Sequence, residues 1–340
     1  MFTFSARPVT RRVGRVVVAA LALAVVMPVA NVVATSSRAH ALDPIPRDFD
    51  TWHETAVATP GGRPEIVTSD TDGFIWYADG LNNQLVRVDP VSGDQLPFSL
   101  GTVHRGVMDL VMGPDGDVWF GDTSNSAIGR LDPRTGIVDS FPLGAPFDWA
   151  YSLAVGSDGN IWFGEPSAGG LGAIAPDGTI TRVPDPDGAI ITDVVSAPDG
   201  RLWYTRAGFT SLGVFDPHTR TFDTVPLGLV DVSGLALAHN GTLWATGTGA
   251  LANVTQSGSI TIVPLPPASY GAVVPENVIA GDFMQVYFTE VSGSIGRVDL
   301  DGTVSFVRPP FARAQPGHLA VSSIGSLWYV DIARGVLGSV

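Results

Sequence analysis

A tryptophan inside a short apolar run recurs along this chain at a nearly constant interval. It stands at positions 76, 119, 162, 203, 244 and 328, with Tyr287 in the remaining place, so successive members are 43, 43, 41, 41, 43 and 41 residues apart. A period of about 40–45 residues with four strand-like segments per period is typical of β-propellers. The spacing therefore predicts seven copies of one structural unit.

Each copy contains the same four segments. A short apolar segment such as residues 153–155 leads through a Gly/Asp turn to the Trp strand, and a third segment and a fourth that ends in Pro-Leu follow, as at 127–133 and 139–143. Apolar runs of this length bounded by Gly, Pro and Asp predict strands. We therefore expect an all-β, seven-bladed β-propeller with four-stranded antiparallel blades. We interpret the Asp70-Thr71-Asp72-Gly73 pattern as a turn, because it lacks the further ligands of a calcium loop.

The two ends of the repeat array complement each other. The seventh copy stops at Val340, after its third segment, and residues 48–54 have the alternating pattern of an outer strand. An open ring would leave strand edges unpaired. We therefore expect an N-terminal strand to complete the last blade and close the ring, so that residues 42–340 form a single domain.

Residues 1–41 have the organisation of a secretory signal peptide. They carry five Arg and no acidic residue, and the order is basic residues, an apolar stretch at 16–34 and a small-x-small pattern at 39–41. A membrane anchor is the alternative, but the 19-residue stretch contains Pro28 and Asn31 and is short for a span. The prediction is cleavage and secretion, with no membrane attachment afterwards. Residues 10–15 also resemble a twin-arginine signal, and the sequence leaves the export route open.

Charge and composition narrow the classes of partner. The formal net charge is −14, and without residues 1–41 only 14 Arg would stand against 33 acidic residues. Such a chain is a poor partner for nucleic acid. The absence of Cys excludes disulfides and thiolate metal sites. We expect a monomer that takes a small-molecule or peptide ligand.

Two sets of polar residues are expected at one opening of the central channel, because the first strand of a blade starts where the second ends. Three residues past each Trp position stand Asp79, Asp122, Glu165, Arg206, Gly247, Glu290 and Asp331. Ten or eleven residues before it stand Glu65, Asp109, Asp193, Glu276 and His318. A cluster of carboxylates suits Mg²⁺ or Ca²⁺. Alternatively, these acids are hydrated turn residues or pair locally, as Glu165 could with Arg206.

Several strings of the repeat resemble the virginiamycin B lyase family, also called streptogramin B lyases. They are Ile-Trp-Phe-Gly-Glu at 161–165, Tyr-Phe-Thr-Glu at 287–290, Ile-Gly-Arg-Val at 295–298 and Phe-Pro-Leu at 141–143. The resemblance implies an enzyme that opens a cyclic depsipeptide at its ester by elimination. In such an enzyme Mg²⁺ would polarise the ester carbonyl, and a His would remove the neighbouring proton.

The catalytic strings of the family match in part. The family carries Pro-His-Ala-Ile and Glu-Pro-His-Gly-Ile in its last two units, where this chain reads Pro-Glu-Asn-Val at 275–278 and Gln-Pro-Gly-His-Leu at 315–319. The resemblance therefore implies His318 as the catalytic base and Mg²⁺ (or Ca²⁺) on Glu276, Glu290 and Asp331. A one-residue shift near a strand start can turn a side chain to the other face.

Two functions remain open. The first is a metal-dependent lyase at the acidic opening. The second is a non-catalytic secreted propeller that binds a ligand, a cation or a protein partner there. A sugar-lactone hydrolase propeller is a third option, but no string of the repeat favours it.

Overall fold

The structure is a computed structural model that describes residues 51–101, 106–144, 148–167, 169–268, 271–281, 285–299, 301–322 and 325–340. Within these ranges the chain forms 28 strands and no helix, so no described helix could cross a membrane. By its internal contacts the chain divides into two units, residues 1–37 and 38–340. The expected signal peptide, residues 1–41, lies outside the described residues.

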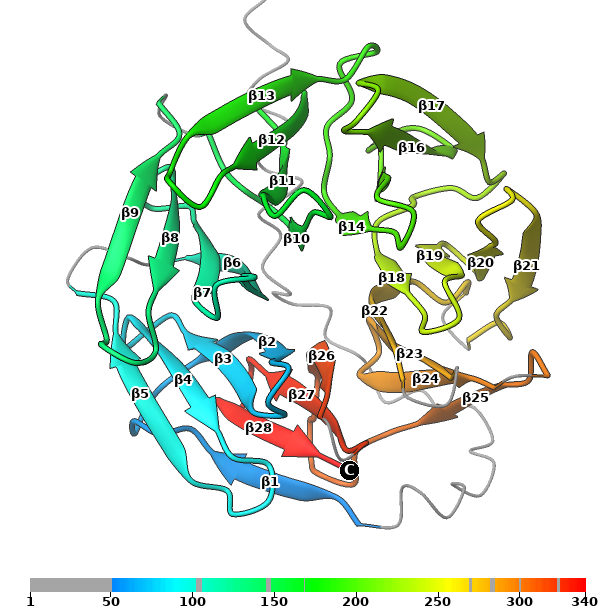
Figure 1. The fold of residues 1–340 in the computed structure, drawn as a ribbon. Coiled ribbons are helices and arrows are strands. Elements are labelled where there is room, and N and C mark those ends of the chain that lie inside the picture. Colours follow the sequence, from blue (N-terminus) through cyan, green and yellow to red (C-terminus); the bar gives the residue numbers. More distant parts are fainter. Residues whose placement is uncertain are drawn as a thin grey trace, which may run out of the picture. The chain divides into compact units, whose positions relative to one another are not determined.

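The strands form seven antiparallel sheets of four strands each, as the repeat predicts (Figure 1). The first blade is made of β2 (Pro64–Ser69), β3 (Ile75–Asp79), β4 (Gln84–Val88) and β5 (Gln95–Ser99), and the second of β6 (Val107–Met112), β7 (Val118–Asp122), β8 (Ala127–Leu131) and β9 (Val138–Pro142). The third is made of β10 (Leu153–Val155), β11 (Ile161–Glu165), β12 (Gly170–Ile174) and β13 (Ile180–Pro184). The fourth is made of β14 (Val194–Ser196), β15 (Leu202–Tyr204), β16 (Ser211–Asp216) and β17 (Thr221–Pro226).

The last three blades repeat this order. They are β18 (Leu235–Leu237), β19 (Leu243–Gly247), β20 (Ala250–Val254) and β21 (Ile260–Pro264); β22 (Pro275–Ala280), β23 (Val286–Glu290), β24 (Ser294–Val298) and β25 (Val304–Val307); and β26 (Pro316–Val321), β27 (Leu327–Asp331) and β28 (Val336–Ser339) with β1 (His53–Ala56). We number the blades 1 to 7 in this order.

The first strand of each blade is the innermost, and these strands contact one another in a closed cycle. β2 contacts β6, and the contacts continue through β10, β14, β18, β22 and β26 back to β2 (Figure 1). Because every blade has the same strand order, the starts of all inner strands lie on one face of the ring. We call this the inner-start face.

The N-terminal strand β1 supplies the fourth strand of blade 7. It pairs with β28 from His53↔Ser339 to Ala56↔Val336. Arg334 binds Glu54 through two hydrogen bonds, one of them 2.9 Å from Nη2 to Oε2. The strand begins at His53 within the described residues, whereas residues 48–54 were expected to form it.

The repeated Trp is buried between neighbouring blades, and in blades 1 and 3 its indole hydrogen-bonds to the turn that precedes its strand. Trp76 is fully buried in a cluster that includes Phe120 of the next blade. Its indole Nε1 donates to Asp70 Oδ2 at 2.8 Å, and Trp162 Nε1 donates to Asp158 Oδ1 at 3.1 Å. The turn Asp thus satisfies a polar atom that would be costly to bury alone. This confirms the turn interpretation at Asp70.

The glycine of the third strand is required by the aromatic ring beside it. Phe288 follows the Trp position on β23 and pairs with Gly296 on β24. A Cβ atom at Gly296 would lie 2.1 Å from the Phe288 ring, and at Gly172 it would lie 2.2 Å from the Phe163 ring. The glycine of the Ile-Gly-Arg string therefore allows the aromatic ring of the neighbouring strand to pack directly against the backbone.

Candidate functional site

The inner strands of blades 6 and 7 begin with β-bulges that contain the sequence-predicted site residues. In blade 6, Pro275 pairs with Glu290 and the next regular pair is Val278↔Phe288. In blade 7, Pro316 pairs with Asp331 and the next pair is Leu319↔Tyr329. Residues 276–277 and 317–318 are therefore the bulged ones. A bulge turns side chains away from the regular alternation, which makes it a common feature of functional sites.

The register identifies Asn277, not Glu276, as the equivalent of His318. Asn277 and His318 each directly precede the residue that resumes regular pairing. Each is also ten residues before the Trp position of its own blade, whereas Glu276 is eleven before it. A fixed offset of ten would have found Asn277 and also Ser152, which the sequence analysis missed.

Side chains ten residues before the Trp position join the inner strand of one blade to that of the next. Asn277 Oδ1 accepts a hydrogen bond from the Leu319 backbone N–H at 3.0 Å. The same contact is made by Asp109 with Leu153 N and by Asp193 with Leu235 N, each at 2.7 Å. The Asn277 amide nitrogen lies 3.4 Å from His318 Nδ1. These side chains therefore connect blades 2 and 3, 4 and 5, and 6 and 7.

Asp109 and Asp193 lie on either side of a serine hydroxyl. Ser152 Oγ donates to Asp193 Oδ1 at 2.7 Å. Burial raises the pKa of Asp109 to about 7, and the nearby charge of Asp193 adds to this effect. Burial likewise raises the pKa of Asp193 to about 6. Both carboxyl groups therefore change protonation near neutral pH.

The surroundings of His318 and Glu276 shift their pKa values in opposite directions. Burial lowers the pKa of His318 to about 4, because loss of hydration disfavours the imidazolium ion, and the ring is neutral at pH 7. Glu276 is an exposed residue of β22. Its reduced hydration, together with the charge of Glu290, raises its pKa above the usual range.

Glu290 and Asp331 are buried at the ends of β23 and β27. They are 1% and 0% exposed. Glu290 Oε2 accepts from Ser292 N at 3.0 Å, and Asp331 accepts from the backbone N–H groups of Gln315 and Arg334 at 3.0 and 3.1 Å. Burial raises the pKa of Asp331. Both carboxylates therefore satisfy backbone amides rather than facing a ligand.

The other carboxylates past the Trp position are also buried at the ends of their strands. Asp79 accepts from the backbone N–H of Arg63, and Asp122 accepts from that of Asn125. Glu165 forms an ion pair with Arg182 at 2.5 Å, whereas Arg206, the local partner that the sequence offered as an alternative, binds Asp185 and Asp187. These carboxylates therefore cap turns or pair with neighbouring side chains. That the whole set lines one opening stays a prediction.

These residues do not provide a ready site for Mg²⁺ or Ca²⁺. Across the described ranges, no group of three or more His, Asp or Glu side chains is arranged to hold a metal ion. Glu290 and Asp331 already accept hydrogen bonds from the backbone, whereas a cation of this kind needs several free oxygen ligands. The residues present thus do not fit the expected metal, and the roles of Glu276, Glu290 and Asp331 as ligands remain a prediction.

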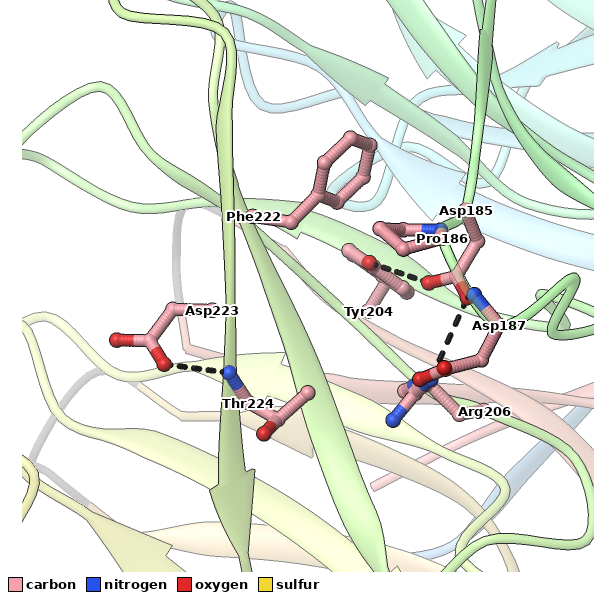
Figure 2. Close-up of a pocket in the computed structure, with 8 residues that line it drawn as sticks. All are labelled: Asp185, Pro186, Asp187, Tyr204, Arg206, Phe222, Asp223 and Thr224. Atoms are coloured by element: carbon pink, nitrogen blue, oxygen red, sulfur yellow. Dashed lines mark hydrogen bonds and ion pairs between the residues drawn. The ribbon is translucent and has the colours of Figure 1, made fainter.

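Arg206 of blade 4 lines a pocket (Figure 2). Five other blades carry an acid at this position, and blade 5 carries Gly247. It is 3% exposed and binds Asp185 Oδ1 at 3.3 Å and also Asp187. Tyr204 donates to Asp185 Oδ2 at 2.7 Å. Because the arginine charge is neutralised by its own neighbours, we interpret this cluster as structural.

Three exposed apolar side chains of blades 6 and 7 lie on the inner-start face, as Glu276 and His318 do. Val274 directly precedes β22, Val291 directly follows β23 and Ile332 directly follows β27; they are 37%, 41% and 43% exposed. Apolar side chains that remain exposed beside polar groups are a common feature of binding sites. The site thus combines two proton-binding side chains with an apolar rim.

Comparison with known proteins places the chain in a family. The model of the virginiamycin B lyase family matches residues 50–228, more than half of the chain. The chain belongs to this family. The resemblance predicted from the repeat strings is thereby confirmed. The match covers blades 1 to 4, whereas Glu276 and His318 lie in blades 6 and 7.

Solved structures of the same family are similar in fold. A streptogramin B lyase is 25% identical with a TM-score of 0.77, covering 85% of this chain and 96% of that one. Virginiamycin B lyase from Staphylococcus aureus is 22% identical with a TM-score of 0.76, covering 85% and 98%. A catalytically inactive His-to-Ala variant of the latter was solved with quinupristin.

The same fold also occurs in proteins with other functions. Hydrazine synthase from Kuenenia stuttgartiensis is 13% identical with a TM-score of 0.69, covering 84% of this chain and 97% of that one. The search of curated proteins gives no match. The activity must therefore be argued from the site itself.

Proposed function

We propose that this protein binds an ester-containing cyclic depsipeptide on the inner-start face of blades 6 and 7 and opens it by elimination. One observation carries the proposal: Glu276 and His318 lie on the bulged starts of neighbouring inner strands, beside the exposed apolar residues of the rim. Membership of the virginiamycin B lyase family supports the class of reaction.

The reaction needs one group that takes a proton and one that stabilises the leaving oxygen. A proton leaves Cα, its electron pair forms a Cα=Cβ double bond, and the Cβ–O ester bond breaks to release a carboxylate. A hydrogen-bond donor at the ester carbonyl stabilises the charge that develops there, and a nearby base accepts the proton. Glu276 and His318 are the side chains we assign to these tasks.

Incubation with quinupristin tests the proposal. Elimination gives a linear product of unchanged mass, whereas hydrolysis adds one water, so chromatography with mass spectrometry distinguishes the two. We expect the linear isomer from the wild type, its loss in His318→Ala and Glu276→Ala, and no change in His218→Ala, which alters an exposed turn. A wild type that forms no linear isomer, with or without Mg²⁺, refutes the proposal.

Binding without turnover is the second candidate. It is favoured by the engagement of Glu290 and Asp331 with backbone amides, which leaves few free oxygens for catalysis. Calorimetric titration with quinupristin, and separately with Mg²⁺ and Ca²⁺, tests it. Heat of binding without any linear product supports this second candidate over the lyase.

We also propose that the protein is secreted after cleavage behind Ala41. The support is the order of basic, apolar and small residues in 1–41. Mass analysis of the protein from culture medium should give a chain that begins at Leu42. A full-length chain retained in the membrane fraction contradicts it.

A further inference from the structure

The amide of Asn277 has a defined orientation between two inner strands. Its Oδ1 accepts from the Leu319 backbone N–H at 3.0 Å, and its Nδ2 faces His318 Nδ1 at 3.4 Å. The opposite orientation would bring the NH₂ group against the Leu319 N–H, and two donors would then meet. The backbone of blade 7 therefore determines which end of the amide faces the imidazole.

This orientation determines where the neutral imidazole carries its proton. An amide NH₂ group only donates, so the ring nitrogen that faces it must accept. His318 Nδ1 is therefore unprotonated, and the single proton of the neutral ring lies on Nε2. The low pKa of His318 agrees with a neutral ring at pH 7.

The acidic residues on the strands packed against β26 do not change the neutral state of the His318 ring. The elements packed against β26 are β2, β22, β23 and β27, and their nearby acids are Glu65, Glu276, Glu290 and Asp331. Negative charge would favour the imidazolium ion. Burial outweighs it, since the pKa of His318 lies below the ordinary value.

We propose that Asn277 is a positioning residue that fixes His318 as the Nε2–H tautomer, so that the imidazole offers a ligand a hydrogen-bond donor and not a proton acceptor.

This tautomer assigns different tasks to His318 and Glu276 in the proposed reaction. This consequence rests on the proposed function. His318 Nε2–H donates to the ester carbonyl oxygen, and the Glu276 carboxylate takes the Cα proton. The Cα electrons form the double bond, and the ester oxygen leaves as part of a carboxylate. The roles differ from those implied by the sequence, where His318 was the base.

Nitrogen-15 NMR of the labelled full chain tests the tautomer without any substrate. Protonated and unprotonated ring nitrogens have well-separated shifts, and His318→Gln identifies the signals of His318 by their loss. We expect Nε2–H in the wild type. In Asn277→Asp the new carboxylate accepts from Nδ1–H, so we expect the proton to move to Nδ1. Nδ1–H in the wild type, or the same tautomer in both proteins, overturns the proposal.

A matched control separates the tautomer from the stability of the inner strands. Asp193→Asn exchanges the same two groups at the equivalent position of blade 4, where Asp193 holds Leu235. We expect it to leave the His318 shifts unchanged. A change in the His318 tautomer in this variant would contradict a local effect of Asn277.

Turnover of quinupristin by variants then tests the roles assigned to His318 and Glu276. If the wild type turns over quinupristin, we expect Glu276→Gln to lower kcat by about 10²-fold or more. We expect His318→Asn, which keeps a donor, to retain more activity than His318→Ala. Equal losses in both His318 variants contradict the donor role. A wild type without turnover refutes the proposed function alone, because the NMR result stands by itself.

Discussion

Raising the pH from about 5 to about 8 should weaken the folded protein, because Asp109 and Asp193 hold protons in the fold that the unfolded chain has already lost. Their pKa values rise from 3.8 to about 7 and about 6 on folding. Near pH 4 and below, the unfolded chain also binds these protons, and the stabilisation is fully present. It is lost as the pH rises through the folded-state values, so stability falls with pH in this window.

The magnitude follows from the same values. A tenfold change in a protonation equilibrium corresponds to about 1.4 kcal/mol. The upper limits are therefore about 4 kcal/mol for Asp109 and about 3 kcal/mol for Asp193. Both side chains are partly accessible to solvent, which reduces the cost of ionisation. We expect a total loss of about 2–4 kcal/mol in the free energy of unfolding between the two pH values.

Urea unfolding followed by tryptophan fluorescence measures this loss. The Asp109→Asn variant cannot ionise and should show a smaller fall in the free energy of unfolding with pH, whatever its stability at one pH. Asp301→Asn is the matched control, because the pKa of this exposed Asp301 lies below its usual value and outside the window. Stability that is flat or rises from pH 5 to 8, or an unchanged pH dependence in Asp109→Asn, would refute the reasoning.

Two further changes test the construction of the blades. Deletion of residues 51–56 removes the fourth strand of blade 7 and leaves the edge of β28 unpaired; we expect a lower melting temperature, and an unchanged one shows that the strand does not hold the ring closed. Gly296→Ala places a Cβ atom 2.1 Å from the Phe288 ring and should reduce the free energy of unfolding by about 1–3 kcal/mol. Adding Phe288→Leu should lessen the crowding; a double variant that merely sums two losses would contradict the contact.

The architecture could be predicted from the sequence because one residue per blade marks the register. The Trp position on the second strand determines the strand on either side, and the Gly/Asp turns separate them. The start of β1 differs from the sequence pattern. Residues 48–54 alternate in character, but pairing with β28 begins at His53, and the partner strand, not the pattern, decides where pairing starts.

The site could be predicted only in part, because bulges and turns determine where a side chain points. Asn277 resembled an ordinary polar residue in the sequence, yet the bulge in β22 places its amide against the next blade. Asp331 stood at the expected distance from its Trp, but its oxygens accept backbone N–H groups. An acid at the end of a strand has the same sequence pattern whether it faces a ligand or a turn.

The pairing of β1 with β28 has a topological consequence. His53 lies opposite Ser339. The last strand, β28, and the first, β1, therefore lie side by side like the two strands of a hairpin that has no connecting turn. In a chain that begins at residue 51, a linker of about 2–5 residues, the length of ordinary hairpin loops, would make the polypeptide circular without altering any blade. A circular permutant opened at another hairpin would bury the same clusters, because the ring has no intrinsic first blade.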